Sequence, residues 1–171
     1  MTEAVSSGRA KTCFFTGHRS LPRGADGALV AELDVTLRRL RFDGYTDFVC
    51  GGAVGFDTVA ACRVAAAAKR DPGFRLILVL PCRDQTALWK KTEDVALYQK
   101  LKGLAAEVVY VRDFFDDGVM LERDRMMADM SSLCVAYYDG RKGGGTAYTV
   151  RYAEKLCLPV VNLYDKVNNI S

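Results

Sequence analysis

Residues 12–20 read TCFFTGHRS: a short, almost continuously apolar run ends in a glycine and two side chains that can carry positive charge. Five similar runs follow along the chain. Continuous rather than alternating apolar residues are typical of strands that are covered on both faces, as in parallel sheets. The predicted strands are Thr12–Thr16, Asp47–Cys50, Arg75–Leu80, Glu107–Val111, Leu133–Tyr138 and Pro159–Leu163.

Helical patterns fill the segments between these runs. Leucines recur every three or four residues in 26–41, and residues 56–69 are dense in alanine, a strong helix former. The predicted helices are Asp26–Arg41, Phe56–Lys69, Gln85–Leu101, Val119–Met130 and Ala147–Leu156. Strands that alternate with helices indicate parallel strands joined by right-handed crossovers. We therefore predict a doubly wound, Rossmann-like α/β fold, with a mostly parallel sheet of about six strands and helices on both faces.

A length of 171 residues suits one domain. No repeat, linker or change of composition divides the chain, so we predict a single domain over residues 12–171, preceded by a flexible leader over residues 1–11. The leader lacks the apolar core of a signal peptide, and no apolar run approaches the roughly 18 residues of a membrane helix. We therefore expect a cytoplasmic protein with no membrane partner.

The charged residues nearly balance. The 24 basic and 21 acidic residues give a net charge of +3, and the isoelectric point is about 8.5. Since domains that coat nucleic acid usually exceed an isoelectric point of about 9, this balance argues against a nucleic-acid partner. The six cysteines form no C-x-x-C pair and there is one histidine, so we expect reduced thiols, no metal site and no required cofactor.

The first candidate binding segment is Thr16-Gly17-His18-Arg19-Ser20, directly after the first predicted strand. In an open α/β sheet, ligands bind beyond the carboxyl ends of the strands. Gly17 lets a ligand approach the backbone, and the guanidinium group of Arg19 suits phosphate or carboxylate. We therefore favour ligand binding by Thr16, Gly17, His18 and Arg19 over an ordinary turn.

Residues 51–57, GGAVGFD, follow the second predicted strand and open the alanine-rich helix. Free N–H groups at such a turn, together with the helix dipole, favour an anion. The spacing differs from the dinucleotide fingerprint G-x-G-x-x-G. Two interpretations of Asp57 stay open: it caps the helix or complements its dipole, or it accepts hydrogen bonds from ribose hydroxyls. The predicted ligand-binding residues of this segment are Gly51, Gly52, Ala53, Gly55 and Asp57.

Residues 139–146, DGRKGGGT, precede the last predicted helix. Three consecutive glycines cost chain entropy, and a cradle of N–H groups around a phosphate would account for them. A flexible surface loop is the alternative, and the segment is not a P-loop because G-x-x-x-x-G-K-[ST] is absent. The predicted ligand-binding residues of this segment are Gly143, Gly144, Gly145 and Thr146.

Two further segments support a site at this edge of the sheet. Pro81 ends the third predicted strand, and Arg123 lies near the start of the fourth predicted helix. Both are predicted to bind the ligand, while a solvated ion pair with a carboxylate is the alternative for Arg123. Trp89 either stacks on a base or packs as a partly buried side chain.

The chain resembles the SLOG superfamily of Rossmann-like nucleotide-binding domains, most closely its YpsA-like branch, from Thr12 to about Leu163. The motifs that carry the resemblance are Phe15–Arg19, Gly51–Asp57 and Tyr138–Gly140 followed by Gly143–Thr146. The resemblance implies a pocket for a nucleotide or a nucleotide-derived ligand, such as an ADP-ribose-like compound, and self-association as a dimer or tetramer. The leading hypothesis is a cytosolic ligand sensor that holds phosphate on its glycine-rich loops.

An enzyme is the alternative. The LOG phosphoribohydrolases look similar and cleave the N-glycosidic bond of nucleoside 5'-monophosphates; their pattern has M-x-x-R-K and P-G-G-x-G-T-x-x-E. This chain keeps Arg123 but has Asp124 in place of the lysine and Thr149 in place of the catalytic glutamate. Because an oxocarbenium-like transition state needs a nearby carboxylate, these changes argue against hydrolysis unless Asp57 or Glu122 supplies one. The catalytic candidates are thus Asp57, Glu122 and Arg123.

Single-stranded DNA binding is the third hypothesis. The DNA-processing protein DprA binds single-stranded DNA and has a glycine turn similar to residues 52–57. Such binding requires a basic groove with aromatic platforms. Acidic residues are nearly as numerous here as basic ones, so this hypothesis ranks last.

Overall fold

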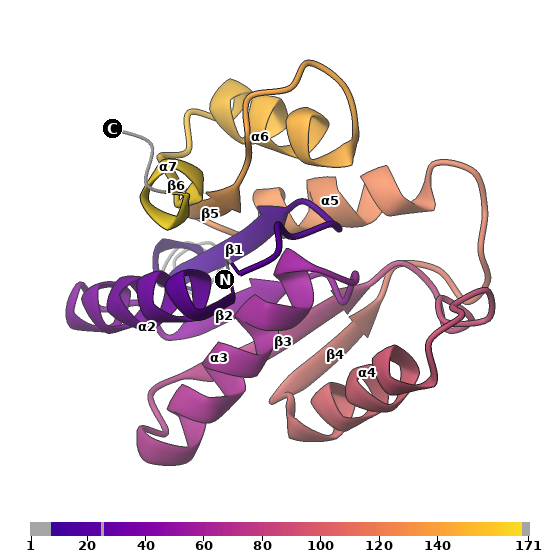
Figure 1. Ribbon diagram of the computed structural model, residues 1–171, viewed down its shortest axis with the longest axis horizontal. Coiled ribbons are helices and arrows are strands. Elements are labelled where there is room, and N and C mark those ends of the chain that lie inside the picture. Colours follow the sequence, from indigo (N-terminus) through magenta and orange to yellow (C-terminus); the bar gives the residue numbers. More distant parts are fainter. Residues whose placement is uncertain (1–7, 25, 169–171) are drawn as a thin grey trace.

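Six strands form one sheet in the computed structural model, which describes residues 8–24 and 26–168. The strands are β1 (Thr12–Gly17), β2 (Asp47–Cys50), β3 (Arg75–Leu80), β4 (Glu107–Tyr110), β5 (Leu133–Tyr137) and β6 (Val160–Asn162). Their order across the sheet is β4-β3-β2-β1-β5-β6, and every pair of neighbours is parallel. The predicted doubly wound α/β fold is confirmed (Figure 1).

Helices cover both faces of the sheet. They are α2 (Asp26–Phe42), α3 (Phe56–Arg70), α4 (Thr92–Leu104), α5 (Val119–Asp129), α6 (Gly145–Lys155) and α7 (Tyr164–Val167). The first three and α7 contribute side chains to one hydrophobic cluster, whereas α5 and α6 contribute to a second cluster on the opposite face. No helix in 8–24 or 26–168 is long and apolar enough to cross a membrane.

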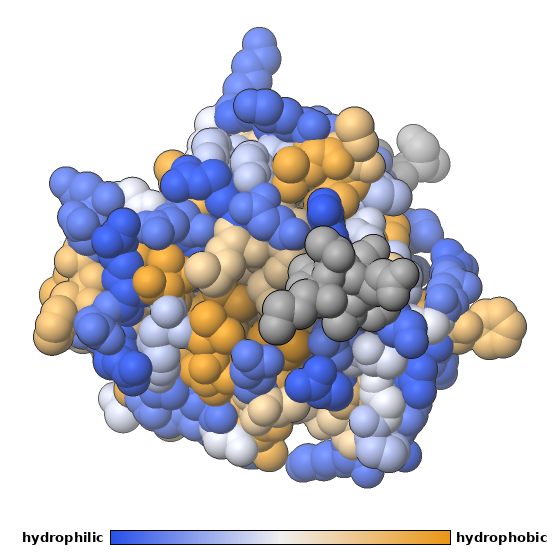
Figure 2. Space-filling model, turned by 180° about the vertical axis from the view of Figure 1, so that it is seen from behind, coloured by the Kyte–Doolittle hydropathy of each residue, from blue (hydrophilic) through white to orange (hydrophobic). Residues whose placement is uncertain are grey.

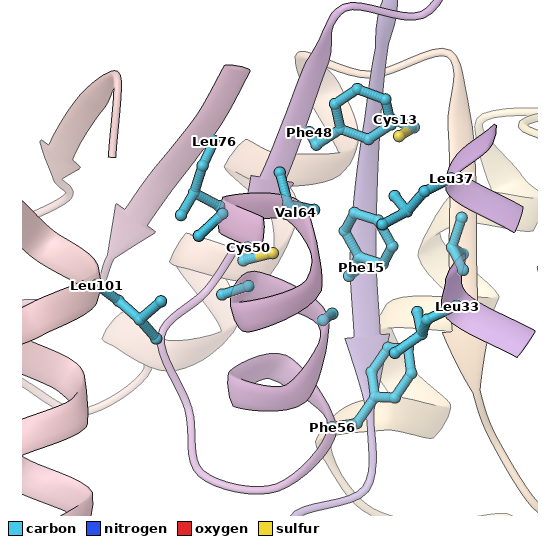
Figure 3. Packing of buried hydrophobic residues seen from close by; sticks show 14 of the residues in the cluster. Cys13, Phe15, Leu33, Leu37, Phe48, Cys50, Phe56, Val64, Leu76 and Leu101 are labelled. Atoms are coloured by element: carbon cyan, nitrogen blue, oxygen red, sulfur yellow. The ribbon is translucent and has the colours of Figure 1, made fainter. Parts of the chain in front are cut away.

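Successive side chains of β1 belong to opposite clusters. Cys13 and Phe15 lie in the cluster under α2 and α3, and Phe14 between them lies in the cluster under α5 and α6. All three side chains are fully buried, which explains why the sequence of this strand is continuously apolar. Figure 3 shows Leu37 of α2 next to Phe15, and Leu33 of the same helix next to Phe56.

The order in which strands are added to the sheet changes direction at β1. Strands β1 to β4 succeed one another toward one edge, and β5 then pairs with the other side of β1. Gly17 at the end of β1 is in register with Tyr137 at the end of β5. Ligands of open α/β sheets bind at such a switch point, beyond the carboxyl ends of the two strands.

The predicted helix Gln85–Leu101 is wrong at its start, because α4 begins at Thr92. Backbone N–H groups of Ala87 and Trp89 donate to carbonyls three residues earlier, and residues 84–88 form turns. Trp89 packs edge-on against Tyr98 of α4 with ring centroids 5.4 Å apart. The packing interpretation of Trp89 therefore fits the structure.

Part of the predicted leader has a defined conformation. Residues 1–7 lie outside the described part of the chain, and residues 8–10 form a helical turn. The Nε of Arg9 donates to the carbonyl oxygen of Ser131 at 3.2 Å, which ties this turn to the loop before β5.

Hydrophilic and hydrophobic side chains are interspersed on the surface. On the face turned away from the Figure 1 viewpoint, hydrophilic side chains form the rim and hydrophobic ones gather along the middle (Figure 2). The large hydrophobic side chains that are exposed are Val35, Phe42, Leu88, Leu104, Phe114, Phe115 and Met126. Two of them, Phe114 and Phe115, are adjacent in the connection between β4 and α5.

Candidate functional site

A cleft of about 380 Å³ opens at the carboxyl ends of β1 and β5, where the topology predicts a ligand. It is lined by Thr16, Gly17, His18, Arg19, Ser20, Ala53, Asp57, Met120, Leu121, Arg123, Asp124, Arg141, Gly143, Gly144, Gly145 and Thr146. The structure thus brings together most of the predicted ligand-binding residues from three glycine-containing segments and α5. Ligand pockets commonly have volumes of roughly 300–1,000 Å³.

Two glycines of the motifs are required by packing. A Cβ atom at Gly17 would lie 2.5 Å from the ring of Phe56, and one at Gly55 would lie 2.3 Å from the carbonyl oxygen of Arg19. Gly55 also has a φ of +85°, which disfavours any other residue. These glycines let the loop after β1 lie directly against the turn before α3.

The glycines at the start of α6 are not tightly packed. A Cβ atom at Gly143, Gly144 or Gly145 would meet no atom of the described chain within 4 Å. Gly144 is the N-cap of α6, and no side chain caps that helix end. Packing therefore does not explain this glycine run, and backbone N–H groups at the start of α6 are left next to the cleft.

His18 connects the two loops that flank the switch point. Its side chain is buried, and its Nε2 accepts a hydrogen bond from the backbone N–H of Asp139 at 3.0 Å. Burial, followed by the charge of Arg141, lowers the pKa of His18. The imidazole is therefore a neutral acceptor at this position, and the positive charges of the cleft come from arginines.

A buried charge cluster, formed by Asp57, Arg123 and Asp124, lies at the base of the cleft. The Nε of Arg123 donates to Oδ1 of Asp124 at 2.7 Å, and its Nη1 donates to the carbonyl oxygen of Gly51. Buried charges are stable only when paired, so this arrangement fixes the start of α5 against the turn after β2. The interpretation of Arg123 as a solvated ion pair is wrong, since its side chain is buried.

Asp57 reaches back over the start of α3. Gly55 is the N-cap of that helix, and Oδ2 of Asp57 accepts the backbone N–H of Ala53 at 3.4 Å. Burial raises the pKa of Asp57 to about 7, with Arg123 opposing the rise and Asp124 adding to it. The capping interpretation of Asp57 is wrong, since no side chain caps this helix end. Asp57 lies in the first turn of α3 and lines the cleft, so an interaction with the helix dipole and hydrogen bonds to a ribose both remain open.

The two residues that depart from the LOG pattern contact each other. The fully buried Thr149 on α6 places its Oγ1 3.0 Å from Oδ2 of Asp124 on α5 and 2.8 Å from the carbonyl oxygen of Gly145. Asp124 lines the cleft, and the Thr149 hydroxyl lies behind it without reaching the cleft wall. Sequence reasoning did not propose Asp124 as a site residue, although its mismatch with the pattern was a signal.

Several predicted residues lie beside the cleft rather than on its wall. Gly51, Gly52, Gly55 and Pro81 do not line it. A Cβ atom at Gly52 would lie 2.4 Å from the side chain of Leu80, so packing requires this glycine.

Glu122, one of the three catalytic candidates, is also outside the cleft. Glu122 points away from it, and its carboxylate accepts a hydrogen bond from Nε of Arg112 at 2.9 Å. Arg141, by contrast, lines the cleft although the sequence had not singled it out. Its guanidinium group binds the Asp139 carboxylate, which lowers the pKa of Asp139.

Comparison with known proteins gives a family and a fold. The family model described as the YspA SLOG family matches residues 27–158. The uncharacterized SPbeta prophage-derived protein YoqJ of Bacillus subtilis is 29% identical over 123 residues, which cover 65% of this chain and 71% of YoqJ.

Solved structures of low sequence identity share the architecture. DNA processing protein A of Helicobacter pylori, described with a single-stranded DNA binding mode, superposes with a TM-score of 0.60 at 20% identity. The Streptococcus pneumoniae protein DprA gives 0.62 at 13%. This chain aligns over 92% and 94% of its own length but spans only 66% and 56% of theirs. The protein TM1055 gives a TM-score of 0.54 at 17% identity, with 94% of this chain and 81% of TM1055 aligned.

Proposed function

The chain belongs to the YspA SLOG family, and we propose that its cleft binds a small nucleotide or a nucleotide-derived anion such as an ADP-ribose-like compound. The observation that carries this proposal is the glycine run at the start of α6. All three glycines face open space, and a φ of +98° accounts for Gly144, but neither contacts within the described chain nor a positive φ require glycine at 143 and 145. A phosphate group fits there because backbone N–H groups and the helix dipole both favour an anion.

Arg19 supplies positive charge around that position. It lines the same cleft as Gly143–Thr146, and guanidinium groups bind phosphate oxygens in pairs of hydrogen bonds. Arg141 lines the cleft too, but its guanidinium group already binds Asp139. The hydroxyl group of Thr146 is a further donor at the same wall. The phosphate end of the ligand therefore lies between the loop after β1 and the start of α6.

Other residues of the cleft suit a sugar and a base. The carboxyl groups of Asp57 and Asp124 can accept hydrogen bonds from ribose hydroxyls, and Met120 and Leu121 offer apolar surface to a base. A site with donors for a phosphate and acceptors for sugar hydroxyl groups fits a nucleoside phosphate better than a plain anion.

A thermal-unfolding screen tests this proposal. Nucleoside monophosphates, nucleoside diphosphates and ADP-ribose are added to the purified chain, and a ligand at 100 times its Kd should stabilise it by about 2.7 kcal/mol. Gly145→Val should abolish the stabilisation, because the new side chain fills the open space at the start of α6.

The matched control is Gly103→Val in α4, where a Cβ atom also meets nothing within 4 Å. This variant should keep the full ligand response. The proposal fails if none of these compounds raises the melting temperature, or if the Gly145→Val protein responds like the wild type.

N-glycosidic bond hydrolysis is the second candidate, favoured by one observation. Asp57 has a pKa of about 7 and lies in the cleft with a second carboxyl group, Asp124. Such a pair can supply a proton to a leaving base and stabilise positive charge on the sugar. Chromatography of incubated nucleoside monophosphates would detect a free base, and Asp57→Asn should remove that product while nucleotide binding persists.

A further inference from the structure

A groove of about 340 Å³ lies between α2 and α3, near the amino ends of the strands. One face of each helix lines it, through residues spaced three and four apart. Its floor is apolar and consists of Leu37, Ala66, Ala67 and Phe74. The two alanines are small, so the space above them is not filled by the helices.

The rim of this α2–α3 groove is positively charged. It holds Arg38, Arg41, Arg63 and Arg70 together with Asp34 and Asp71. Asp34 is already bound by Arg63 at 2.8 and 2.9 Å, and Asp71 by Arg41 at 3.2 Å. Neither Arg38 nor Arg70 forms an ion pair with any residue in 8–24 or 26–168. The groove therefore fits an apolar group that is flanked by carboxylates.

The chain itself contains a segment with that chemistry. Residues 113–117 read DFFDD, and every residue from 112 to 118 is exposed. Phe114 and Phe115 are 75% and 62% exposed, which is costly for two adjacent aromatic side chains. Asp113 is already bound by Nε of Arg83 at 3.1 Å, whereas Asp116 and Asp117 form no ion pair with any residue in 8–24 or 26–168. Two carboxylates and two phenyl rings therefore complement two free guanidinium groups and an apolar floor.

The segment and the groove lie at opposite ends of the strands. Residues 113–117 follow the carboxyl end of β4, whereas the groove lies where α2 and α3 end and Phe74 leads into β3 (Figure 1). One copy therefore cannot fill its own groove. We propose that residues 113–117 of one copy insert Phe114 and Phe115 into the α2–α3 groove of a second copy.

This contact is head-to-tail: one copy uses its segment and the other its groove, so the pair as a whole keeps one free groove and one free segment. Such heterologous contacts close into rings or continue as filaments. Two aromatic side chains bury roughly 300–500 Å² in total, well below a standard protein interface of about 1,600 Å². The association is therefore weak, and its charged rim makes it weaker at high salt.

Sedimentation velocity of the whole chain from micromolar to millimolar concentration tests this contact. The wild type should grow in average mass with concentration, and less so at high salt. Phe114→Ser with Phe115→Ser should leave a monomer, as should Arg38→Glu with Arg70→Glu. The four side chains are at the surface, and circular dichroism checks that both variants fold.

Mixing the two variants is the decisive experiment. The Ser variant keeps an intact groove and the Glu variant keeps an intact segment, so the mixture should form a 1:1 heterodimer that grows no further. Leu88→Ser, which removes another exposed apolar side chain, should associate like the wild type. The proposal is overturned by a wild type that stays monomeric, by an associating Ser variant, or by a mixture that stays monomeric.

Discussion

Asp57 has the most strongly perturbed carboxyl group of the cleft. One guanidinium group, that of Arg123, serves two buried carboxyl groups and hydrogen-bonds directly to Asp124. The other carboxyl group is therefore more stable as the neutral acid, in agreement with a pKa of about 7 for Asp57. Carboxyl groups perturbed in this way are enriched at functional sites, which supports placing the ligand beside Asp57.

This perturbation predicts how stability depends on pH. Between about pH 4 and pH 7 the folded protein keeps a proton on Asp57 that the unfolded chain has lost, so the free energy of unfolding falls as the pH rises. The contribution is up to about 4 kcal/mol and is lost above the folded pKa. Asp57→Asn imitates the neutral acid, so urea denaturation from pH 5 to pH 8 should show a smaller fall.

An exposed carboxyl group provides the control for this measurement. Asp26→Asn, at the start of α2, should follow the wild-type pH dependence. If the Asp57→Asn protein also follows it, then Asp57 is ionised in the folded protein throughout the range, and the buried charge cluster is balanced in another way.

At the scale of elements, α5 and α6 meet through a polar contact inside a mostly apolar interface. The side chains of Met127 and Val150 belong to the hydrophobic cluster between these helices and the sheet. Thr149 contacts Asp124 inside that interface, and Asp124 in turn lines the cleft. This contact holds the carboxylate of Asp124 in position beside Arg123.

Thr149→Val tests that contact, because it keeps the shape of the side chain and removes the hydroxyl group. One carboxylate oxygen of Asp124 then loses its donor in a buried place, and the free energy of unfolding should fall by about 1–3 kcal/mol. Thr36→Val is the matched control, since the Thr36 hydroxyl also donates to a carbonyl four residues earlier but reaches no carboxylate. Equal losses in the two variants, measured by urea denaturation, would contradict a stabilising role of the Thr149–Asp124 contact.

The strands could be predicted from sequence because burial on both faces leaves a direct trace. β2 and β3 have the predicted bounds, and the other strands differ by one or two residues. The start of α4 could not be predicted, since residues 85–91 contain helix formers and yet lie outside the helix, where Trp89 packs against Tyr98. The residue pattern within a short segment carries no information about a contact with a residue in the next helix or strand.

Some residues of the candidate site could likewise be predicted from the sequence and others could not. The three glycine-containing segments could be assigned from their places after strands, and the switch point between β1 and β5 brings them together. Arg141 could not be assigned, because nothing in residues 139–146 shows which polar side chain faces the cleft. The signal for Asp124 was its mismatch with the LOG pattern, where a lysine is expected. Only the packing of α5 shows that Asp124 lines the cleft while Glu122 faces Arg112.

At the scale of the whole molecule, the fold alone does not distinguish a mononucleotide from a nucleic-acid strand. The solved structures that share this architecture include a protein described as binding single-stranded DNA, at 20% identity. A fold hosts different functions, and the residues of the site decide between them. Here the cleft has a volume of only about 380 Å³, and the exposed segment 113–117, with its three acidic side chains, leads into α5 beside it.

These acidic groups predict that a mononucleotide binds and a strand does not. Labelled oligothymidylate should show no mobility shift with the purified chain even at low salt, because repulsion by the acidic groups opposes a path of many phosphates. A nucleoside phosphate bound in the cleft should respond only weakly to salt, since it offers one or two phosphate groups. A mobility shift at low salt that weakens 10³- to 10⁵-fold between about 50 and 200 mM salt would instead indicate 6–10 phosphate contacts and make DNA the ligand. Gly145→Val would then separate the sites, since loss of the shift would place the strand in the cleft.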